Sequence, residues 1–240
     1  MLNQLAKILE GTNKILFFTG AGISVPSGIP DFRSSRGLYQ QGTYRGYQPE
    51  EIISHSFFAT HTEAFYKFYK EKMMFLTARP NEAHEFIAHL EAKGKSLGVI
   101  TQNIDGLHQM AGSKNVVELH GSIHRNYCQK CDKAYDANYI KEASGVPKCS
   151  CGGIIKPDVV LYEEPLDTGM LERAVQLIYQ ADCLIVIGTS LVVNPAAALV
   201  SYFRGKYFLI INRSSTPYDY RANLVINEDI IKVVEALKMI

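Results

Sequence analysis

The chain has 240 residues, enough for one domain with a buried core, with or without an added lobe. Basic and acidic residues nearly balance at a net charge of +1, so no bulk attraction to nucleic acid or membrane is expected. The sequence contains no apolar run long enough to span a bilayer. Residues 1–4 also lack the charged-then-apolar pattern of a secretion signal, so we expect a cytoplasmic protein.

Short apolar runs alternate with helical patterns along the chain, which predicts an α/β fold with a parallel sheet and helices on both faces. The expected strands lie at 15–18, 97–100, 183–187 and 207–211, and small or polar residues follow each one directly. These residues should gather at the carboxyl edge of the sheet, where open α/β sheets bind ligands.

Apolar residues recur at helical spacing between these strands. The stretches 80–93 and 171–178 both have this periodicity and are predicted helices. Asn194 followed by Pro195 predicts the N-cap and first turn of a further helix.

Two stretches do not fit the alternation and are predicted to form a small lobe, with the ligand cleft between lobe and sheet. Residues 34–79 are rich in aromatic residues, and residues 124–155 contain four of the 5 cysteines. We predict a single domain over residues 1–240. Its parts are a Rossmann-like part (1–33, 80–123 and 156–240), a helical insertion (34–79) and a zinc-binding insertion (124–155).

The cysteines of the second insertion have the spacing of a metal site. Cys128 and Cys131 form a C-x-x-C pair, and Cys149 and Cys151 form a C-x-C pair farther along the chain. Two close pairs around a hairpin-sized segment suit a tetrahedral Zn²⁺ site, and a site with four protein ligands is typically structural. A redox-active pair is the alternative. Cys183 lies in an apolar run and is predicted to be buried, so the cysteine usage favours a reducing compartment.

Polar and glycine-rich motifs follow the first two predicted strands. The turn at 20–28 would let the backbone approach a pyrophosphate, but it lacks the full G-x-G-x-x-G pattern, and a tight turn without a ligand is the alternative. An aromatic ring and a guanidinium come next, at Phe32 and Arg33. The second strand ends in the hydrogen-bonding run 102–105, and His120 with Gly121 precedes the cysteines.

In this order the motifs resemble those of the sirtuin family of NAD-dependent protein deacylases, in its bacterial and archaeal form. The matching segments run from residue 19 to residue 212. They are Gly20-Ala21-Gly22-Ile23-Ser24, Gly28-Ile29-Pro30-Asp31-Phe32-Arg33, Thr101-Gln102-Asn103-Ile104-Asp105, His120-Gly121, the four cysteines, Gly188-Thr189-Ser190-Leu191 and Asn212. The resemblance implies an NAD-dependent protein-lysine deacetylase that transfers acetyl to ADP-ribose, with NAD as co-substrate, one structural Zn²⁺ and an acetyl-lysine protein or peptide as partner.

The resemblance also implies catalytic roles. His120 would be the general base, and an imidazole with an ordinary pKa of about 6.5 suits this role near neutral pH. Asn103 and Asp105 would position the ribose and nicotinamide, and Phe32 would shield the reacting carbon from water. The cofactor-binding residues implied are Gly20, Ala21, Gly22, Val25, Asp31, Phe32, Arg33, Gln102, Asn103, Ile104, Asp105, His120, Gly188, Thr189, Ser190, Asn212, Asp229 and Ile230.

Substrate contacts are expected from Val159, Val160, Tyr162, Glu163 and Tyr66, with the peptide adding as a strand at the 159–163 edge. The family usually has Phe-Gly-Glu where this chain has Tyr162, Glu163 and Glu164. If the glycine position needs a positive φ, Glu163 costs stability or reshapes the loop, and its carboxylate would favour basic peptides. Val25 also replaces a common threonine, which removes a hydroxyl contact to the diphosphate.

Acyl selectivity is expected to favour short, uncharged groups. Relatives that remove succinyl or malonyl groups carry Tyr-x-x-Arg, and this chain has Tyr66 and Tyr69 at the matching positions. Without the arginine, a buried acyl carboxylate would lack its counter-charge.

Two other functions are also compatible with the NAD-site motifs and the cysteine pairs. Mono-ADP-ribosyl transfer to protein would use the same NAD site with another nucleophile. A zinc-ribbon module that binds nucleic acid is the third reading, but the flat net charge and the missing aromatic platform argue against it.

Overall fold

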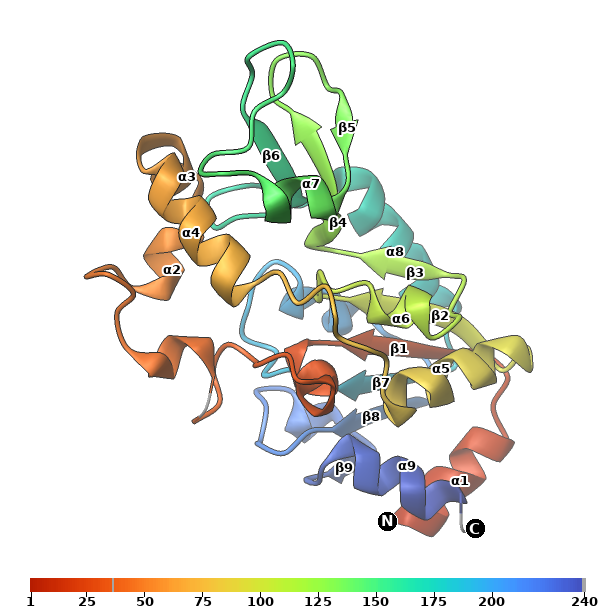
Figure 1. Ribbon diagram of the computed structural model, residues 1–240. Coiled ribbons are helices and arrows are strands. Elements are labelled where there is room, and N and C mark those ends of the chain that lie inside the picture. Colours follow the sequence, from red (N-terminus) through yellow and green to blue (C-terminus); the bar gives the residue numbers. More distant parts are fainter. Residues whose placement is uncertain (36, 239–240) are drawn as a thin grey trace.

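The structure, a computed structural model, describes residues 1–35 and 37–238. At its centre is a parallel sheet of 6 strands in the order β3-β2-β1-β7-β8-β9 (Figure 1). The strands are β1 (Ile15–Thr19), β2 (Ser96–Thr101), β3 (Val116–Glu118), β7 (Cys183–Ile187), β8 (Tyr207–Ile211) and β9 (Leu224–Ile226). The four expected strands are confirmed. Sequence periodicity missed β3 and β9, because three residues are too few to show a pattern.

Helices cover both faces of the sheet, which confirms the predicted fold class (Figure 1). On one face lie α1 (Leu2–Glu10), α5 (Glu82–Ala92) and α9 (Ile230–Lys238), and on the other lie α8 (Thr168–Gln180) and the 3₁₀ helix η3 (Ala197–Tyr202). Along β1, Ile15 and Phe17 pack on the first face and Leu16 and Phe18 on the second, as the two-residue period of a strand requires.

The predicted helices at 80–93 and 171–178 correspond to α5 and α8. The prediction of an N-cap at Asn194 is wrong. The peptide bond between Asn194 and Pro195 is cis, and η3 begins only at Ala197, with no side-chain hydrogen bond at its cap. The residue at the N-cap position of η3 is Ala196 and not Asn194. No helix in the described residues combines the length and apolar character needed to cross a membrane.

Two groups of elements lie outside the sheet and share one apolar core. The helical module comprises η2 (Leu38–Gln41), α2 (Pro49–Ile52), α3 (His55–Thr60) and α4 (Thr62–Lys72). The cysteine module comprises the antiparallel strands β4 (Gly121–Cys128), β5 (Ala134–Tyr135) and β6 (Ile155–Val159), with α7 (Ala137–Glu142). Figure 1 shows both modules at one end of the molecule, beside the sheet. The remaining short elements are η1 (Ala21–Ser27), α6 (Leu107–Met110) and η4 (Asp219–Arg221).

The strand order creates a switch point between β1 and β7. From β1 the chain continues to β2 and β3 on one side, and from β7 it continues to β8 and β9 on the other. The loops that follow β1 and β7 therefore diverge, and this divergence opens a crevice at the carboxyl edge of the sheet.

Candidate active site

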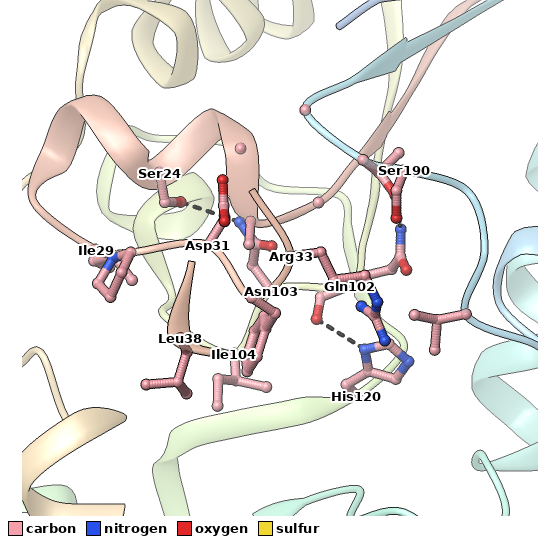
Figure 2. Close-up of a pocket in the computed structure, with 18 of the residues that line it drawn as sticks. Ser24, Ile29, Asp31, Arg33, Leu38, Gln102, Asn103, Ile104, His120 and Ser190 are labelled. Atoms are coloured by element: carbon pink, nitrogen blue, oxygen red, sulfur yellow. Dashed lines mark hydrogen bonds between the residues drawn. The ribbon is translucent and has the colours of Figure 1, made fainter. Parts of the chain in front are cut away.

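A cavity of about 520 Å³ lies at this edge, between the sheet and the two modules, and its size is typical of a small-ligand site. All of the residues predicted to bind the cofactor line it, together with Val159, Val160, Tyr162 and Glu163 from the predicted substrate contacts. The expected position of the cleft is thus confirmed. Lining residues that were not predicted include Ser24, Ile29, Leu38, Tyr39 and Val193, of which Figure 2 shows the first three.

The glycines of the two loops at the switch point allow the loops to touch. The Gly22 amide donates to the Gly188 carbonyl at 2.8 Å. A Cβ at Gly22 would lie 2.8 Å from the Cα of Gly188, and one at Gly188 would lie 2.4 Å from the Ile23 nitrogen. Gly188 also has a φ of 63°. The sequence left open whether the glycines at 20–28 allow approach to a ligand or form a tight turn without one, and the structure shows that backbone contact between the loops already requires Gly22 and Gly188.

A polar cluster of Ser24, Asn103 and Asp105 lines the cavity, and Figure 2 shows the first two joined by a hydrogen bond. The Ser24 hydroxyl donates to Asp105 Oδ2 at 2.7 Å and accepts from Asn103 Nδ2 at 3.0 Å. Burial raises the pKa of the Asp105 carboxyl, while the Leu107 amide and Ser24 hydroxyl partly offset this effect. Asn103 and Asp105 are therefore oriented before any ligand binds. Ser24 was missed as a site residue, although it stands in the glycine-rich motif.

His120 lies in the cavity wall with one ring nitrogen already engaged (Figure 2). Its Nδ1 is 2.9 Å from the Gln102 carbonyl oxygen, and because a carbonyl only accepts, Nδ1 carries the proton. In the neutral ring Nε2 is then the proton acceptor. Burial lowers the pKa of His120, so the ring is neutral at physiological pH. The adjacent Gly121 has a φ of 76°, and a Cβ there would lie 1.9 Å from the Asp158 carbonyl oxygen.

Polar groups also line the part of the cavity that is formed by the loops after β7 and β8 and by the start of α9. Gln102 Nε2 donates to Thr189 Oγ1 at 3.0 Å, which joins the loops after β2 and β7. Asp229 accepts from the Ile231 amide at 2.8 Å and pairs with Arg213. Asn212 follows β8, so residues from three strand ends and from α9 contribute to one wall.

Comparisons with known proteins agree with this geometry. The family model described as Sir2 family matches residues 20–195, most of the chain. The chain belongs to the Sir2 family. It is 55% identical over 238 residues to the NAD-dependent protein deacetylase of Clostridium acetobutylicum, covering 98% of this chain and 97% of the relative. It is 47% identical over 236 residues to the NAD-dependent protein deacetylase of Staphylococcus aureus, covering 98% and 97%.

Solved Sir2 structures extend the likeness to three dimensions. A complex of Sir2 with a p53 peptide and NAD⁺ has a TM-score of 0.86 at 42% identity, covering 100% of this chain and 96% of that one. A Sir2 with a deacetylated p53 peptide and 3′-O-acetyl ADP ribose has a TM-score of 0.88 at 41% identity, covering 99% and 96%. The predicted resemblance to the sirtuins is confirmed.

The four cysteines of this Sir2-family chain converge as their spacing predicted. Their sulfurs all lie within 4.8 Å of one another, and the pairs Cys128–Cys151 and Cys131–Cys149 are 3.4 and 3.6 Å apart. Tetrahedral Zn–S bonds of about 2.3 Å place sulfurs about 3.8 Å apart, so the set fits one structural zinc. The sulfurs are too far apart for a disulfide. Gly153 leaves room for the Cys128 sulfur, because a Cβ at residue 153 would lie 2.6 Å from Cys128 Sγ.

Tyr66 was predicted to contact the substrate, but in this structure it does not line the cavity. Its ring is 1% exposed in the core shared by the two modules, and its hydroxyl donates to the Ile155 carbonyl. Tyr69 is fully buried beside it, with its ring stacked on Phe65 and its hydroxyl without a partner. Both tyrosines therefore attach α4 to the apolar core and do not line the cavity.

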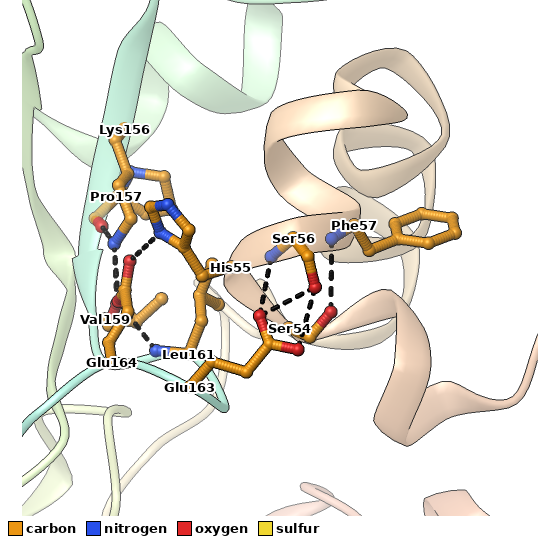
Figure 3. A network of polar contacts seen from close by, with 10 residues as sticks. All are labelled: Ser54, His55, Ser56, Phe57, Lys156, Pro157, Val159, Leu161, Glu163 and Glu164. Carbon is orange, nitrogen blue, oxygen red and sulfur yellow. Dashed lines mark hydrogen bonds and ion pairs between the residues drawn. The ribbon is translucent and has the colours of Figure 1, made fainter.

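Glu163 has the positive φ that the family's glycine suggested, at 74°. Its carboxylate accepts from the Ser56 amide at 2.9 Å and from the Ser56 hydroxyl at 2.7 Å, near the first turn of α3 (Figure 3). These hydrogen bonds lower the pKa of Glu163. The Glu163 carboxylate is therefore hydrogen-bonded to the helical module. This contact argues against the expectation that the carboxylate selects basic peptides.

Glu163→Ala is expected to melt about 2–4 °C below Glu163→Gly, because both variants lose the Ser56 contacts but only alanine retains the strain of a left-handed backbone. Thermal unfolding of the two variants and the native chain measures the difference. Ser56→Ala, which leaves residue 163 unchanged, controls for the lost hydroxyl contact. Equal melting temperatures for the alanine and glycine variants would show that the loop relaxes out of this conformation at no cost.

Proposed function

We propose that this chain is an NAD-dependent protein-lysine deacetylase, which transfers the acetyl group to ADP-ribose and releases nicotinamide and O-acetyl-ADP-ribose. Relatives at 55% identity are named NAD-dependent protein deacetylases. The observation that carries the proposal is the tautomer of His120: its Nδ1 is held by a carbonyl, so a free Nε2 is available in the cavity wall. The four reduced thiols of the zinc site fit a cytoplasmic location.

The residues present fit NAD, which would supply an electrophilic ribose carbon and nicotinamide as leaving group. Gly22 and Gly188 keep side chains away from the switch point, where dinucleotides bind in open α/β sheets. Asn103 and Asp105 would hold the nicotinamide end, because Ser24 fixes both side chains. The wall formed after β8 and at the start of α9 would bind the adenosine end through Asn212, Asp229 and Ile230.

His120 would act as general base in this site. Its Nε2 would accept a proton from a ribose hydroxyl, while the Gln102 carbonyl stabilises the protonated ring through Nδ1. Phe32, in the same wall, would cover the reacting carbon and exclude water. The zinc site takes no part in this chemistry, since four cysteines complete its coordination.

The peptide substrate would bind at the 159–163 edge. Val159 pairs with Gly121 across β4 and β6, and the Val160 amide donates to the His120 carbonyl at 3.0 Å. The substrate edge and the base are therefore joined through one backbone hydrogen bond. An acetyl-lysine held along this edge would enter the cavity beside His120.

The test is mass spectrometry of an acetyl-lysine peptide incubated with this protein and NAD. We expect deacetylated peptide, free nicotinamide and O-acetyl-ADP-ribose in equal amounts. Transfer of ADP-ribose to a protein, without O-acetyl-ADP-ribose, would instead establish the mono-ADP-ribosyltransferase reading. Absence of nicotinamide release would overturn both.

Acetyl-lysine is expected to exceed succinyl-lysine by more than about tenfold in kcat/KM, a difference of about 1.4 kcal/mol. Of the cations in the cavity wall, Lys72 and Arg213 pair with carboxylates, and Arg33 is assigned to the cofactor. Among the described lining residues Arg33 is the cation without an ion pair, and the cofactor would occupy it, so a succinyl carboxylate would lack a counter-charge. Matched acetyl and succinyl peptides measure the ratio, and equal rates would contradict it.

Tyr69→Arg would not create an acyl-carboxylate site, because Tyr69 is fully buried in the core and does not line the cavity. An arginine there would bury an unpaired charge, so the variant should lose stability and gain no desuccinylase activity.

A further inference from the structure

The loop at 161–164 is held on one side by backbone pairing with the helical module. The Tyr162 amide donates to the Ile53 carbonyl, and the His55 amide donates to the Tyr162 carbonyl, both at 3.0 Å. These two bonds form a parallel bridge between Ser54 and Tyr162. The backbone that carries the Tyr162 ring therefore has a defined position.

Side chains reinforce this attachment (Figure 3). Besides the Glu163 contacts with Ser56, Glu164 accepts from the Leu161 amide at 2.9 Å and pairs with Lys156 at 3.0 Å. Its other carboxylate oxygen lies 2.9 Å from His55 Nδ1. The loop is thus connected to both modules through Glu163 and Glu164, the two residues that follow Tyr162.

The Tyr162 hydroxyl reaches in the other direction, to the segment after the glycine-rich turn. The Arg33 guanidinium donates to it at 3.0 Å, and the Tyr39 hydroxyl lies 3.0 Å away. Arg33 also lies over the Tyr39 ring, 5.2 Å from its centroid. One phenolic oxygen therefore joins the proposed substrate loop to the proposed cofactor segment.

The hydrogen-bond partner of the Arg33 guanidinium in this contact is a neutral hydroxyl. None of the ion pairs in the described part of the chain involves Arg33. A neutral phenol orients the guanidinium without cancelling its charge, whereas a carboxylate would neutralise it. The guanidinium lines the cavity with its positive charge available to an anion.

We propose that Tyr162 is a positioning residue, whose hydroxyl holds the Arg33 guanidinium toward the anionic cofactor. The inference rests on the proposed function, because it takes NAD as the ligand of Arg33. The phenylalanine that the family usually has at this place would leave Arg33 with only the Tyr39 ring. Tyr162 thus contributes to cofactor affinity from the substrate loop, through Arg33.

Tyr162→Phe tests the role, because it removes one oxygen and retains the ring. We expect ADP-ribose, a ligand that cannot undergo the reaction, to bind about three- to tenfold more weakly by calorimetry. The KM for NAD should rise by a similar factor, with a smaller effect on kcat. Tyr220→Phe is the matched control, since Tyr220 is 83% exposed and does not line the cavity. Equal ADP-ribose affinity in Tyr162→Phe and the native chain would overturn the proposal.

A double-mutant cycle tests whether the effect passes through Arg33. In an Arg33→Met background, Tyr162→Phe should change ADP-ribose affinity by less than about twofold. A full Tyr162→Phe effect in that background would overturn the role as well. A native chain that neither binds ADP-ribose nor deacetylates peptide would contradict the proposed function itself. A native chain that does both, with an unaffected Tyr162→Phe, would contradict only the positioning role.

Discussion

His120→Ala is expected to reduce kcat/KM for deacetylation by two to four orders of magnitude, the range that general-base catalysis contributes. The loss follows from the removal of Nε2, the nitrogen left free by the bond between Nδ1 and the Gln102 carbonyl. NAD should still bind, because the many other lining residues remain. Peptide deacetylation and NAD affinity measured on the same preparation separate the two effects.

The pH profile gives this prediction a second readout. A general base must be unprotonated, so kcat/KM should fall as pH drops through the pKa of His120 in the free enzyme. Burial lowers that pKa from its ordinary value, so the acid limb should lie below about pH 6.5. The residual activity of His120→Ala should lack this limb. His89→Ala, which removes an exposed histidine of α5, should retain both rate and profile. Full activity in His120→Ala would disprove the role.

Loss of the zinc site is expected to lower the melting temperature by about 10 °C or more and to abolish activity with it. Cys128 and Cys149 belong to the same apolar core as Phe65 and Tyr66 of α4. Because metal binding supplies folding energy in such sites, Cys149→Ser should unfold the cysteine module and loosen the helical module against it. The proposed substrate loop at 161–164, which contacts both modules, would then lose its position.

Metal analysis and thermal unfolding measure this outcome. The native chain should contain one zinc, and a chelator should reproduce the effect of Cys149→Ser. Cys183→Ala is the matched control, since Cys183 is buried in β7 away from the cluster and its loss should leave the zinc content at one. Active protein without zinc, or a disulfide among the four cysteines, would refute the structural role.

Local patterns in the sequence were sufficient for much of this protein. The four longest strands of the sheet are continuous apolar runs because both faces are buried, and such runs need no knowledge of their partners. The metal cluster was predicted from spacing alone, since a chelating pair is a local feature. The ordered motifs after the strands indicated the family, and the residues predicted to bind the cofactor line one cavity, because parallel strands bring their carboxyl ends to one edge.

Only the tertiary structure decided which way individual side chains point. The spacing of Tyr66 in α4 is equally compatible with a cavity wall and with a core, and packing against the cysteine module placed it in the core. The link between Tyr162 and Arg33 spans 129 positions, and that between Glu163 and Ser56 spans 107. No periodic pattern encodes such contacts. They arise where two modules meet. The conformation of each side chain there depends on a surface that a distant part of the chain forms.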